Sequence, residues 1–304
     1  DFGFQQRLMQ TLETAGELDR AVEFLPDDTE LGERSRRSQP LTRPELAVLL
    51  AYAKISLYSA LLDSKVPDDP YLGRELGRYF PKAIADKFPD ALEKHRLRRE
   101  IIATQLANSM INRGGPSLLV RIADQTGASP AGIAAAFAAV RDSYGMPELN
   151  DAINALDGKV SGKVQLSLYA AVQDLLLDRL VWFLRNADLT KGLAGVVEHH
   201  RRGIAALTKT LDAALPADAA AARAARKKEL ADAGVPDELA DLLRDAGFTV
   251  EVFDEVLPDP TDAVVDEGRS SDPEARVRGV GVLHGLDGEG AQPLQLADLG
   301  GELT

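Results

Sequence analysis

The 304-residue sequence contains no cysteine. Disulfide bonds, cysteine metal ligands and cysteine nucleophiles are therefore excluded for this chain, and the composition is compatible with a reducing cytosol. The chain begins at Asp1, with no basic segment followed by an apolar one that would indicate a secretory leader. Its most apolar run, Leu46 to Ala53, is too short to cross a bilayer. We expect a cytoplasmic protein, a fragment or a processed chain, with no membrane partner.

Aromatic residues are also scarce, at 5%, whereas hydrophobic residues as a whole make up 45%. Alanine and leucine dominate the hydrophobic set, and both favour helices, while sheets are richer in aromatic and β-branched residues. The first 246 residues contain neither a dependable strand pattern nor a fixed-period repeat. We therefore predict an all-α fold, a multi-helix bundle of about ten helices over residues 1–246, with a sub-boundary near 187–192.

Acidic residues outnumber basic ones, and the net charge is −13. Residues 250–304 hold 13 acidic and 3 basic residues, so their net charge is −10 and that of residues 1–249 is −3. Helical periodicity stops where the acidity begins, and we expect residues 247–304 to form an acidic, Gly/Pro-containing tail that is disordered or irregular. A nearly neutral body with an acidic tail lacks the basic face that nucleic acids require, so no nucleic-acid partner is expected.

Clear start and stop signals mark the predicted helices. Thr42, followed three residues later by Glu45, is typical of a capping box at the start of a helix over 42–62. A long helix over 92–113 is expected to end at Gly114-Gly115-Pro116. The strongly apolar helix over 161–185 is predicted to form the centre of the body.

A stripe of polar residues on the predicted 92–113 helix is the candidate interface. It comprises Lys94, Arg98, Gln105, Asn108 and Asn112. Amides within an otherwise apolar helix need hydrogen-bond partners, which neighbouring helices or a partner surface would supply. The basic cluster at 94–100 overlaps this stripe, and we expect its charges to pair with acids on neighbouring helices or on another domain. As a nucleic-acid patch the cluster is short and lacks interleaved aromatic residues.

The four histidines and a pair of aspartates are the candidate reactive groups. The histidines are His95, His199, His200 and His284. None has a metal-ligand spacing, and adjacent helical residues diverge by about 100°, so we expect the pair at 199–200 to be a solvated surface pair and no metal to bind. The aspartates at 174 and 178 lie one turn apart, where like charges could raise one pKa. No substrate motif accompanies them, so we interpret them as a structural polar stripe.

Two glycine-rich stretches superficially resemble nucleotide-binding loops. Residues 279–285 contain three glycines, but a dinucleotide fingerprint needs a buried strand before it and a helix after it. An arginine-rich stretch precedes these residues and more glycine follows. Gly114-Gly115-Pro116 lacks the Walker spacing and its lysine, so a tight turn between helices is favoured. We expect no cofactor to bind this chain, and Gly281→Val should leave the NAD affinity of the complete protein unchanged.

Several sequence strings together resemble the C-terminal region of large bacterial NAD-specific glutamate dehydrogenases. They are EFLPDD at 23–28, LTRPELAVLLAYAK at 41–54, PDDPYL at 67–72, YFP at 79–81, HRLRREIIAT at 95–104 and NRGGP at 112–116. The resemblance covers about residues 1–246. It implies, for the whole enzyme, oxidative deamination of L-glutamate to 2-oxoglutarate and ammonia, with NAD accepting the hydride. The residues after about 250 depart from the family pattern.

The resemblance also implies where the chemistry lies. The family's catalytic lysine and its NAD-binding Rossmann domain precede this region, so no catalytic, cofactor-binding or metal-binding residue carries over. The segment is then expected to be inactive alone, to pack against the upstream catalytic region of the same polypeptide or another subunit, and to belong to a homo-oligomer. The alternative is a stand-alone helical protein-interaction module with its own start codon near Asp1. A third reading, an RNA- or DNA-binding helical module, predicts salt-sensitive binding that depends on Arg96, Arg98 and Arg99.

Overall fold

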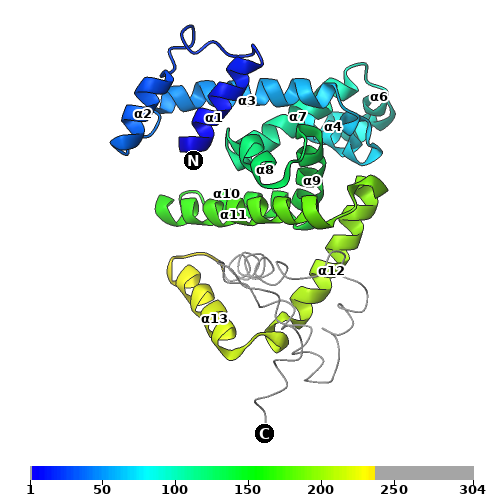
Figure 1. The fold of residues 1–304 in the computed structure, drawn as a ribbon. Coiled ribbons are helices and arrows are strands. Elements are labelled where there is room, and N and C mark those ends of the chain that lie inside the picture. The colour runs from blue at the N-terminus through cyan, green and yellow to red at the C-terminus, as the bar shows by residue number, and fades with distance from the viewer. Residues whose placement is uncertain (1, 237–304) are drawn as a thin grey trace, which may run out of the picture.

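The computed structural model describes residues 2–236, and all regular secondary structure there is helical (Figure 1). The all-α prediction is confirmed, and residues 2–236 alone form thirteen α-helices and three short 3-10 helices, against the ten or so expected. The first are α1 (Phe2–Thr14), α2 (Asp28–Arg36), α3 (Arg43–Leu62), η1 (Val66–Asp68), η2 (Pro70–Gly73), α4 (Arg74–Tyr79), α5 (Lys82–Lys87) and α6 (Pro89–Glu93). The remainder are α7 (Arg98–Gly114), α8 (Leu118–Thr126), α9 (Pro130–Ser143), α10 (Met146–Asn154), α11 (Gly162–Asn186), η3 (Leu189–Lys191), α12 (Leu193–Ala214) and α13 (Ala217–Asp232).

Three predicted features fall partly or wholly beyond the part that the structure describes. These are the last ten residues of the predicted helical body, 237–246, the acidic tail at 247–304 and the glycine pattern at 279–285. The sub-boundary near 187–192 coincides with η3, a short turn between α11 and α12, and it stays a prediction.

The start of α3 follows the sequence signal closely. The Thr42 side chain accepts a hydrogen bond from the backbone N–H of Glu45 at 3.5 Å, and the backbone N–H of Thr42 donates to Glu45 Oε2 at 2.6 Å. Both bonds of the predicted capping box are therefore present. The same carboxylate accepts a hydrogen bond from Arg34 at 2.9 Å, which ties α2 to the first turn of α3.

The predicted helix over 92–113 is wrong in its first turns. The chain forms α6, leaves helical geometry at residues 94–97, and starts α7 at Arg98. At the break, His95 Nδ1 accepts a hydrogen bond from the backbone N–H of Leu97 at 3.1 Å. A local bond of this kind competes with the helical i to i−4 pattern, and periodicity alone does not reveal it.

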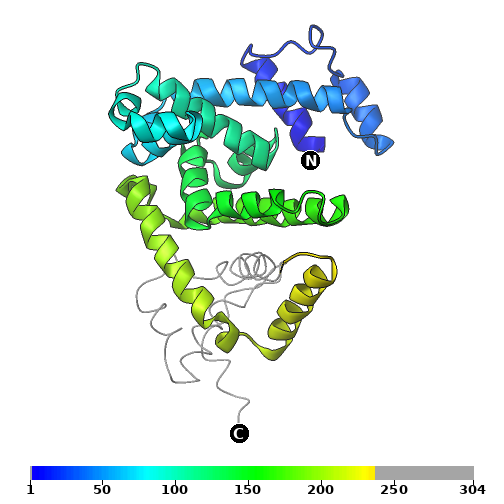
Figure 2. The same cartoon turned by 180° about the vertical axis from the view of Figure 1, so that it is seen from behind.

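Helix α9 is the most enclosed element, not the helix over 161–185 that the sequence favoured. Every residue from Ala136 to Ser143 is buried, and α9 packs against α3, α7, α8, α10, α11 and α12. Four of its buried residues are alanines, whose small side chains allow other helices to approach closely. In Figures 1 and 2, α3 and α11 lie on opposite sides of the layer formed by α7, α8 and α9.

The buried hydrophobic residues form two cores. The larger one takes in residues from α1 to α9, the carboxyl half of α11 and the start of α12. The smaller one joins α10, the amino half of α11 and the end of α13, through residues that include Leu149, Leu168 and Leu230. Helix α11 therefore contributes to both, with Val172 in the smaller core and Leu175 in the larger.

Helix α3 is unusual among the described helices because it is long and apolar enough, by length and composition alone, to cross a membrane. Core helices of soluble proteins pass the same test, so this is weak evidence. Its buried residues are Leu49, Ala53, Leu57 and Leu61, which form a single stripe facing the body. Most of its remaining surface is only partly covered by the described residues.

Candidate functional site

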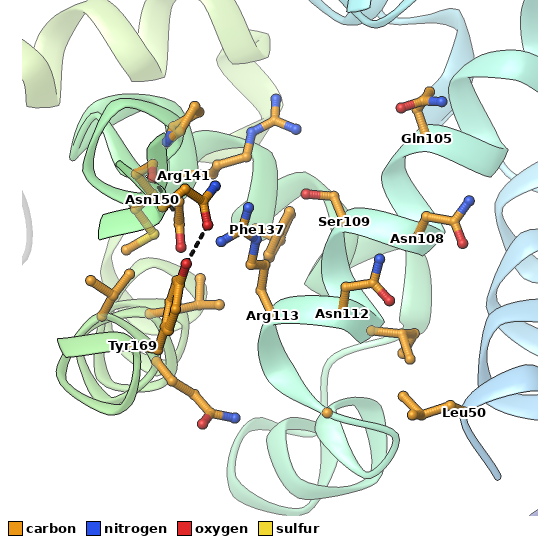
Figure 3. A pocket seen from close by; sticks show the side chains of 18 of the residues that line it. Leu50, Gln105, Asn108, Ser109, Asn112, Arg113, Phe137, Arg141, Asn150 and Tyr169 are labelled. Carbon is orange, nitrogen blue, oxygen red and sulfur yellow. Dashed lines mark hydrogen bonds between the residues drawn. The ribbon is translucent and has the colours of Figure 1, made fainter. Parts of the chain in front are cut away.

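A hollow of about 850 Å³ opens along one face of α7 (Figure 3). Its walls come from α3, α4, α9, α10 and α11, and the glycine turn after α7 closes one end. Leu50 and Leu166 supply apolar surface, with Phe137 and Leu176 buried in the wall, while α7 supplies a row of polar side chains. A concave site of this volume with a few convergent polar groups is typical of small-molecule binding sites.

Three of the five predicted interface residues line this hollow. Gln105, Asn108 and Asn112 follow one another along α7, as the helical wheel predicted (Figure 3). No hydrogen bond joins these amides to another described residue, but Gln105 and Asn108 are partly exposed and Asn112 is exposed, so water can satisfy them. The sequence pattern thus identified a real surface feature, although its role as an interface stays a prediction.

The structure does not bring the other two predicted residues into the hollow. Lys94 follows the last residue of α6 and is exposed, because the break before α7 removes it from the stripe. Arg98 turns to the body, donating to the Pro67 carbonyl oxygen at 2.9 Å and lying 3.5 Å from the Glu93 carboxylate.

The basic cluster at 94–100 is engaged in part within the chain. Arg99 contacts the Asp68 carboxylate and donates to the carbonyl oxygens of Leu62 and Ser64 at 2.8 and 3.0 Å. With the Arg98–Glu93 pair, this confirms the expected pairing with acids on neighbouring elements. Because these bonds occupy the guanidinium groups of Arg98 and Arg99, the two groups are less available to contact the phosphates of a nucleic acid.

Sequence reasoning missed several residues that complete the site. Arg113 lies one residue beyond the predicted stripe, and its side chain is exposed and forms no ion pair among the described residues. Asn150 on α10 is buried and donates to the Met146 carbonyl oxygen at 2.6 Å. Tyr169 on α11 donates to Asn154 Oδ1 at the rim (Figure 3). Only the folding of α10 and α11 against α7 brings these residues together, so no local signal could have identified them.

A buried cluster of charged residues lies at the α4 end of the hollow. Arg141 on α9 donates to Glu75 at 2.7 Å and to both carboxylate oxygens of Asp142 at 2.9 and 3.0 Å. Arg78 lies 2.6 Å from Glu75 and 3.5 Å from Asp142, while Arg74 lies 3.2 Å from Asp142. Glu75 and Arg141 themselves line the hollow, so the cluster forms part of its wall.

Mutual attraction keeps these buried groups charged. Burial favours the neutral form of Asp142, but its hydrogen bond with Arg141 and the attraction of Arg141, Arg78 and Arg74 outweigh burial, so the pKa of Asp142 is lowered. Burial likewise works against the charge of Arg141, yet its bonds and attraction to Asp142 and Glu75 raise the pKa of Arg141 overall. Three guanidiniums face two carboxylates, which leaves the cluster with one excess positive charge.

The other candidate groups lie apart from the hollow. His199 is exposed as expected, but the solvated-pair interpretation is wrong for His200, which is buried with its ring 4.5 Å from that of Phe183 and 5.7 Å from that of Trp182. Asp174 and Asp178 are both exposed on α11, consistent with a structural polar stripe. Among residues 2–236, no group of three or more potential ligands could hold a metal ion.

The glycine turn after α7 has the geometry of a helix end. Gly115 has φ of +83°, in the region that glycine adopts without strain, and its N–H donates to the Ile111 carbonyl oxygen at 3.0 Å. A Cβ on Gly114 would lie 2.6 Å from the Leu118 side chain, so α8 packs directly against the last turn of α7. These contacts support the interpretation as a tight turn between helices.

Comparison with known proteins places these features in a family. The family model described as glutamate dehydrogenase, C-terminal, matches residues 38–257. Proteins named NAD-specific glutamate dehydrogenase are similar to this chain: that of Pseudomonas aeruginosa is 43% identical over 235 residues, covering 77% of this chain and 14% of the relative. That of Halomonas elongata is 39% identical over 245 residues, covering 81% and 15%. That of Mycobacterium tuberculosis is 30% identical over 224 residues, covering 73% and 14%.

The chain thus spans about one seventh of the length of the curated relatives that it matches. The matched family segment includes α3, α7, α9, α10 and α11, and with them every wall of the hollow. On this match the chain belongs to the family of glutamate dehydrogenase C-terminal regions.

Proposed function

We propose that this chain is the helical, non-catalytic C-terminal segment of an NAD-dependent glutamate dehydrogenase. The whole protein would convert L-glutamate, NAD and water to 2-oxoglutarate, ammonia and NADH, in the cytoplasm, with NAD held outside these residues. Two findings support a division into this segment and a separate catalytic region: the names of the relatives, and the small share of their length that this chain matches. The contribution of the segment would be to pack against the catalytic region.

The observation that carries the proposed packing is the outer face of α3. Its buried stripe faces the body, and helical geometry puts Ala47, Ala51 and Ile55 on the opposite side, where all three are exposed. Ile55 alone is 59% exposed. A helix that is apolar all round is normally enclosed on all sides, so an uncovered apolar face indicates that something else covers it.

The occupant that fits this face best is the preceding part of the same polypeptide. About six sevenths of each relative lies outside the matched region, and the family description puts that region at the C-terminal end. Helix α1, through which a preceding segment would enter, packs against α3 (Figures 1 and 2). The catalytic region would therefore join the chain next to α3.

Accessibility of introduced cysteines tests this contact, because the chain has no cysteine of its own. Ile55→Cys should react rapidly with a maleimide in the 304-residue chain and at least ten times more slowly in the full-length enzyme. Ile84→Cys on α5, also an exposed isoleucine at 42%, is the matched control and should react equally in both. Equal reaction of Ile55→Cys in both proteins would refute the contact.

Two further arms identify other occupants and test the absence of catalysis. Protection of Ile55→Cys in the isolated chain by self-association, or by phosphatidylcholine vesicles, would point to a second copy or to lipid in place of the catalytic region. Glutamate-dependent NAD reduction should occur with the full-length protein and not with the isolated chain. Activity of the isolated chain would overturn the non-catalytic assignment.

A further inference from the structure

We propose that the hollow along α7 is a binding site for a small organic anion that carries a carboxylate. This inference goes beyond the proposed function, because it concerns a ligand of this chain itself and needs no contact at α3. Arg113 is the principal group that recognises the charge. It lines the hollow at the carboxyl end of α7 and has no carboxylate partner among the described residues (Figure 3).

Geometry suits the Arg113 guanidinium for a carboxylate. A guanidinium presents parallel N–H groups that match the two oxygens of a carboxylate, and such paired hydrogen bonds are stronger than those between neutral groups. Figure 3 shows Arg113 on the same side of α7 as Phe137 and Tyr169. Of the two rings, that of Phe137 is buried, whereas that of Tyr169 is partly exposed and gives an organic anion apolar surface beside its charged end.

The row of free amides provides the remaining polar contacts. Asn108 and Asn112 are adjacent turns of one helix, and Gln105 continues the row toward the charged cluster. Each amide offers two donors and one acceptor, and none of these groups is used within the described structure. Arg113 lies about 100° around the helix from Asn112 and about 140° from Asn108, so a ligand bound to Arg113 could reach Asn112 but not the whole row.

Charge balance favours an anion over a cation. The buried cluster of three guanidiniums and two carboxylates has one excess positive charge, and Arg113 adds a second. Helix α10, whose first residues Met146 and Pro147 line the hollow, has no side-chain cap at its amino end. Glu148 in the first turn of that helix opposes the positive charge of the helix end, so the excess positive charge at the hollow comes from the guanidiniums.

Size and composition favour a small molecule over a nucleic acid. The hollow of about 850 Å³ lies within the usual range for small-molecule sites. A nucleic acid needs several cations aligned with successive phosphates, whereas the nearby guanidiniums at 78 and 141 are already paired with carboxylates. One free guanidinium beside neutral amides fits a carboxylate-bearing metabolite better.

Titration calorimetry on the 304-residue chain tests the site with succinate, malonate and benzoate as probes. At least one of them should bind with a dissociation constant below about 10 mM, and binding should weaken as salt screens the charges. Arg113→Ala should weaken that binding by at least tenfold, while Arg113→Lys should retain part of it. Arg96→Ala removes an exposed arginine before α7, away from the hollow, and should leave binding unchanged.

Each contrary result has a definite meaning. Equal binding by wild type and Arg113→Ala, or no binding of any probe below about 10 mM, would overturn the proposal. Sulfate or phosphate that binds as tightly as the carboxylates would overturn the assignment of ligand class. Slow maleimide reaction of Asn112→Cys in the ligand-free full-length enzyme, with rapid reaction in the isolated chain, would show that protein fills the hollow. Ile55→Glu should not affect probe binding, which separates this test from that of the α3 contact.

Discussion

Replacing Asp142 with asparagine should destabilise the protein more than any surface change. The Asp142 side chain is 1% exposed and accepts hydrogen bonds from Arg141 at 2.9 and 3.0 Å and from Arg74 at 3.2 Å. Asparagine keeps the shape but removes the charge, and its amide N–H groups face guanidinium donors. Breaking a buried ion pair on one side costs about 3–5 kcal/mol. Arg141 keeps Glu75 as a partner at 2.7 Å, so we expect about 3 kcal/mol.

Urea unfolding followed by circular dichroism measures this loss. With a slope of about 2–3 kcal/mol per M, a loss of about 3 kcal/mol lowers the midpoint by roughly 1–1.5 M. Glu33→Gln is the control, because its pair with Arg37 is exposed at 3.6 Å and should contribute less than about 0.5 kcal/mol. If Asp142→Asn changes the free energy of unfolding by less than about 1 kcal/mol, the reasoning about this cluster is refuted.

The effect of Asp142→Asn should also depend on pH in one direction. The pKa of Asp142 is lowered in the folded protein, so its charge stabilises the fold fully above the pKa of about 3.9 that an unfolded aspartate has. This contribution is lost as the pH falls through the lower, folded-state pKa. The difference between wild type and Asp142→Asn should therefore be constant near neutral pH and shrink in strongly acidic solution.

Four further substitutions test three local interpretations by the same unfolding assay. Thr42→Ala removes the side-chain half of the capping box with Glu45 and should cost about 1 kcal/mol. His200→Ala should cost about 2 kcal/mol because it leaves a cavity beside two aromatic rings, whereas His199→Ala should cost less than about 0.5 kcal/mol; equal effects would contradict the burial difference. Gly115→Ala should cost about 1 kcal/mol, because its φ of +83° strains any residue with a Cβ, and no loss would contradict that turn geometry.

Local sequence signals predicted the helix ends well where the controlling contacts lie within a few residues. Thr42 with Glu45 at α3, and Gly115 after α7, are examples. The helix prediction failed at residues 94–97. There the His95 side chain accepts a hydrogen bond from the backbone N–H of Leu97, which the periodicity of apolar residues does not reveal. The apolar pattern also failed to identify α9 as the most enclosed helix, because alanine is only weakly hydrophobic. Its small side chain nevertheless lets six other helices pack closely against α9.

The candidate site shows a similar limit. The row formed by Gln105, Asn108 and Asn112 was readable because it follows the helical period within one element. The opposite wall comes from α9, α10 and α11, and its position depends on contacts between residues far apart in the chain. The prediction for His200 was wrong for the same reason, since its ring packs against Trp182 and Phe183 of α11, which are distant in the sequence.

The single run of α11 through both cores has a consequence for how the molecule unfolds. Its 25 residues share one continuous ladder of backbone hydrogen bonds, which runs past Leu168 in the smaller core and Phe183 in the larger. Helices fray from their ends, and the end at Gly162 is held by fewer buried contacts. Amide exchange should therefore slow progressively along α11 toward Phe183, so that the small core opens as a sub-global unit while the large one stays closed. Tyr169 and Leu176 on this helix line the hollow, so the hollow lies where the two cooperative units meet.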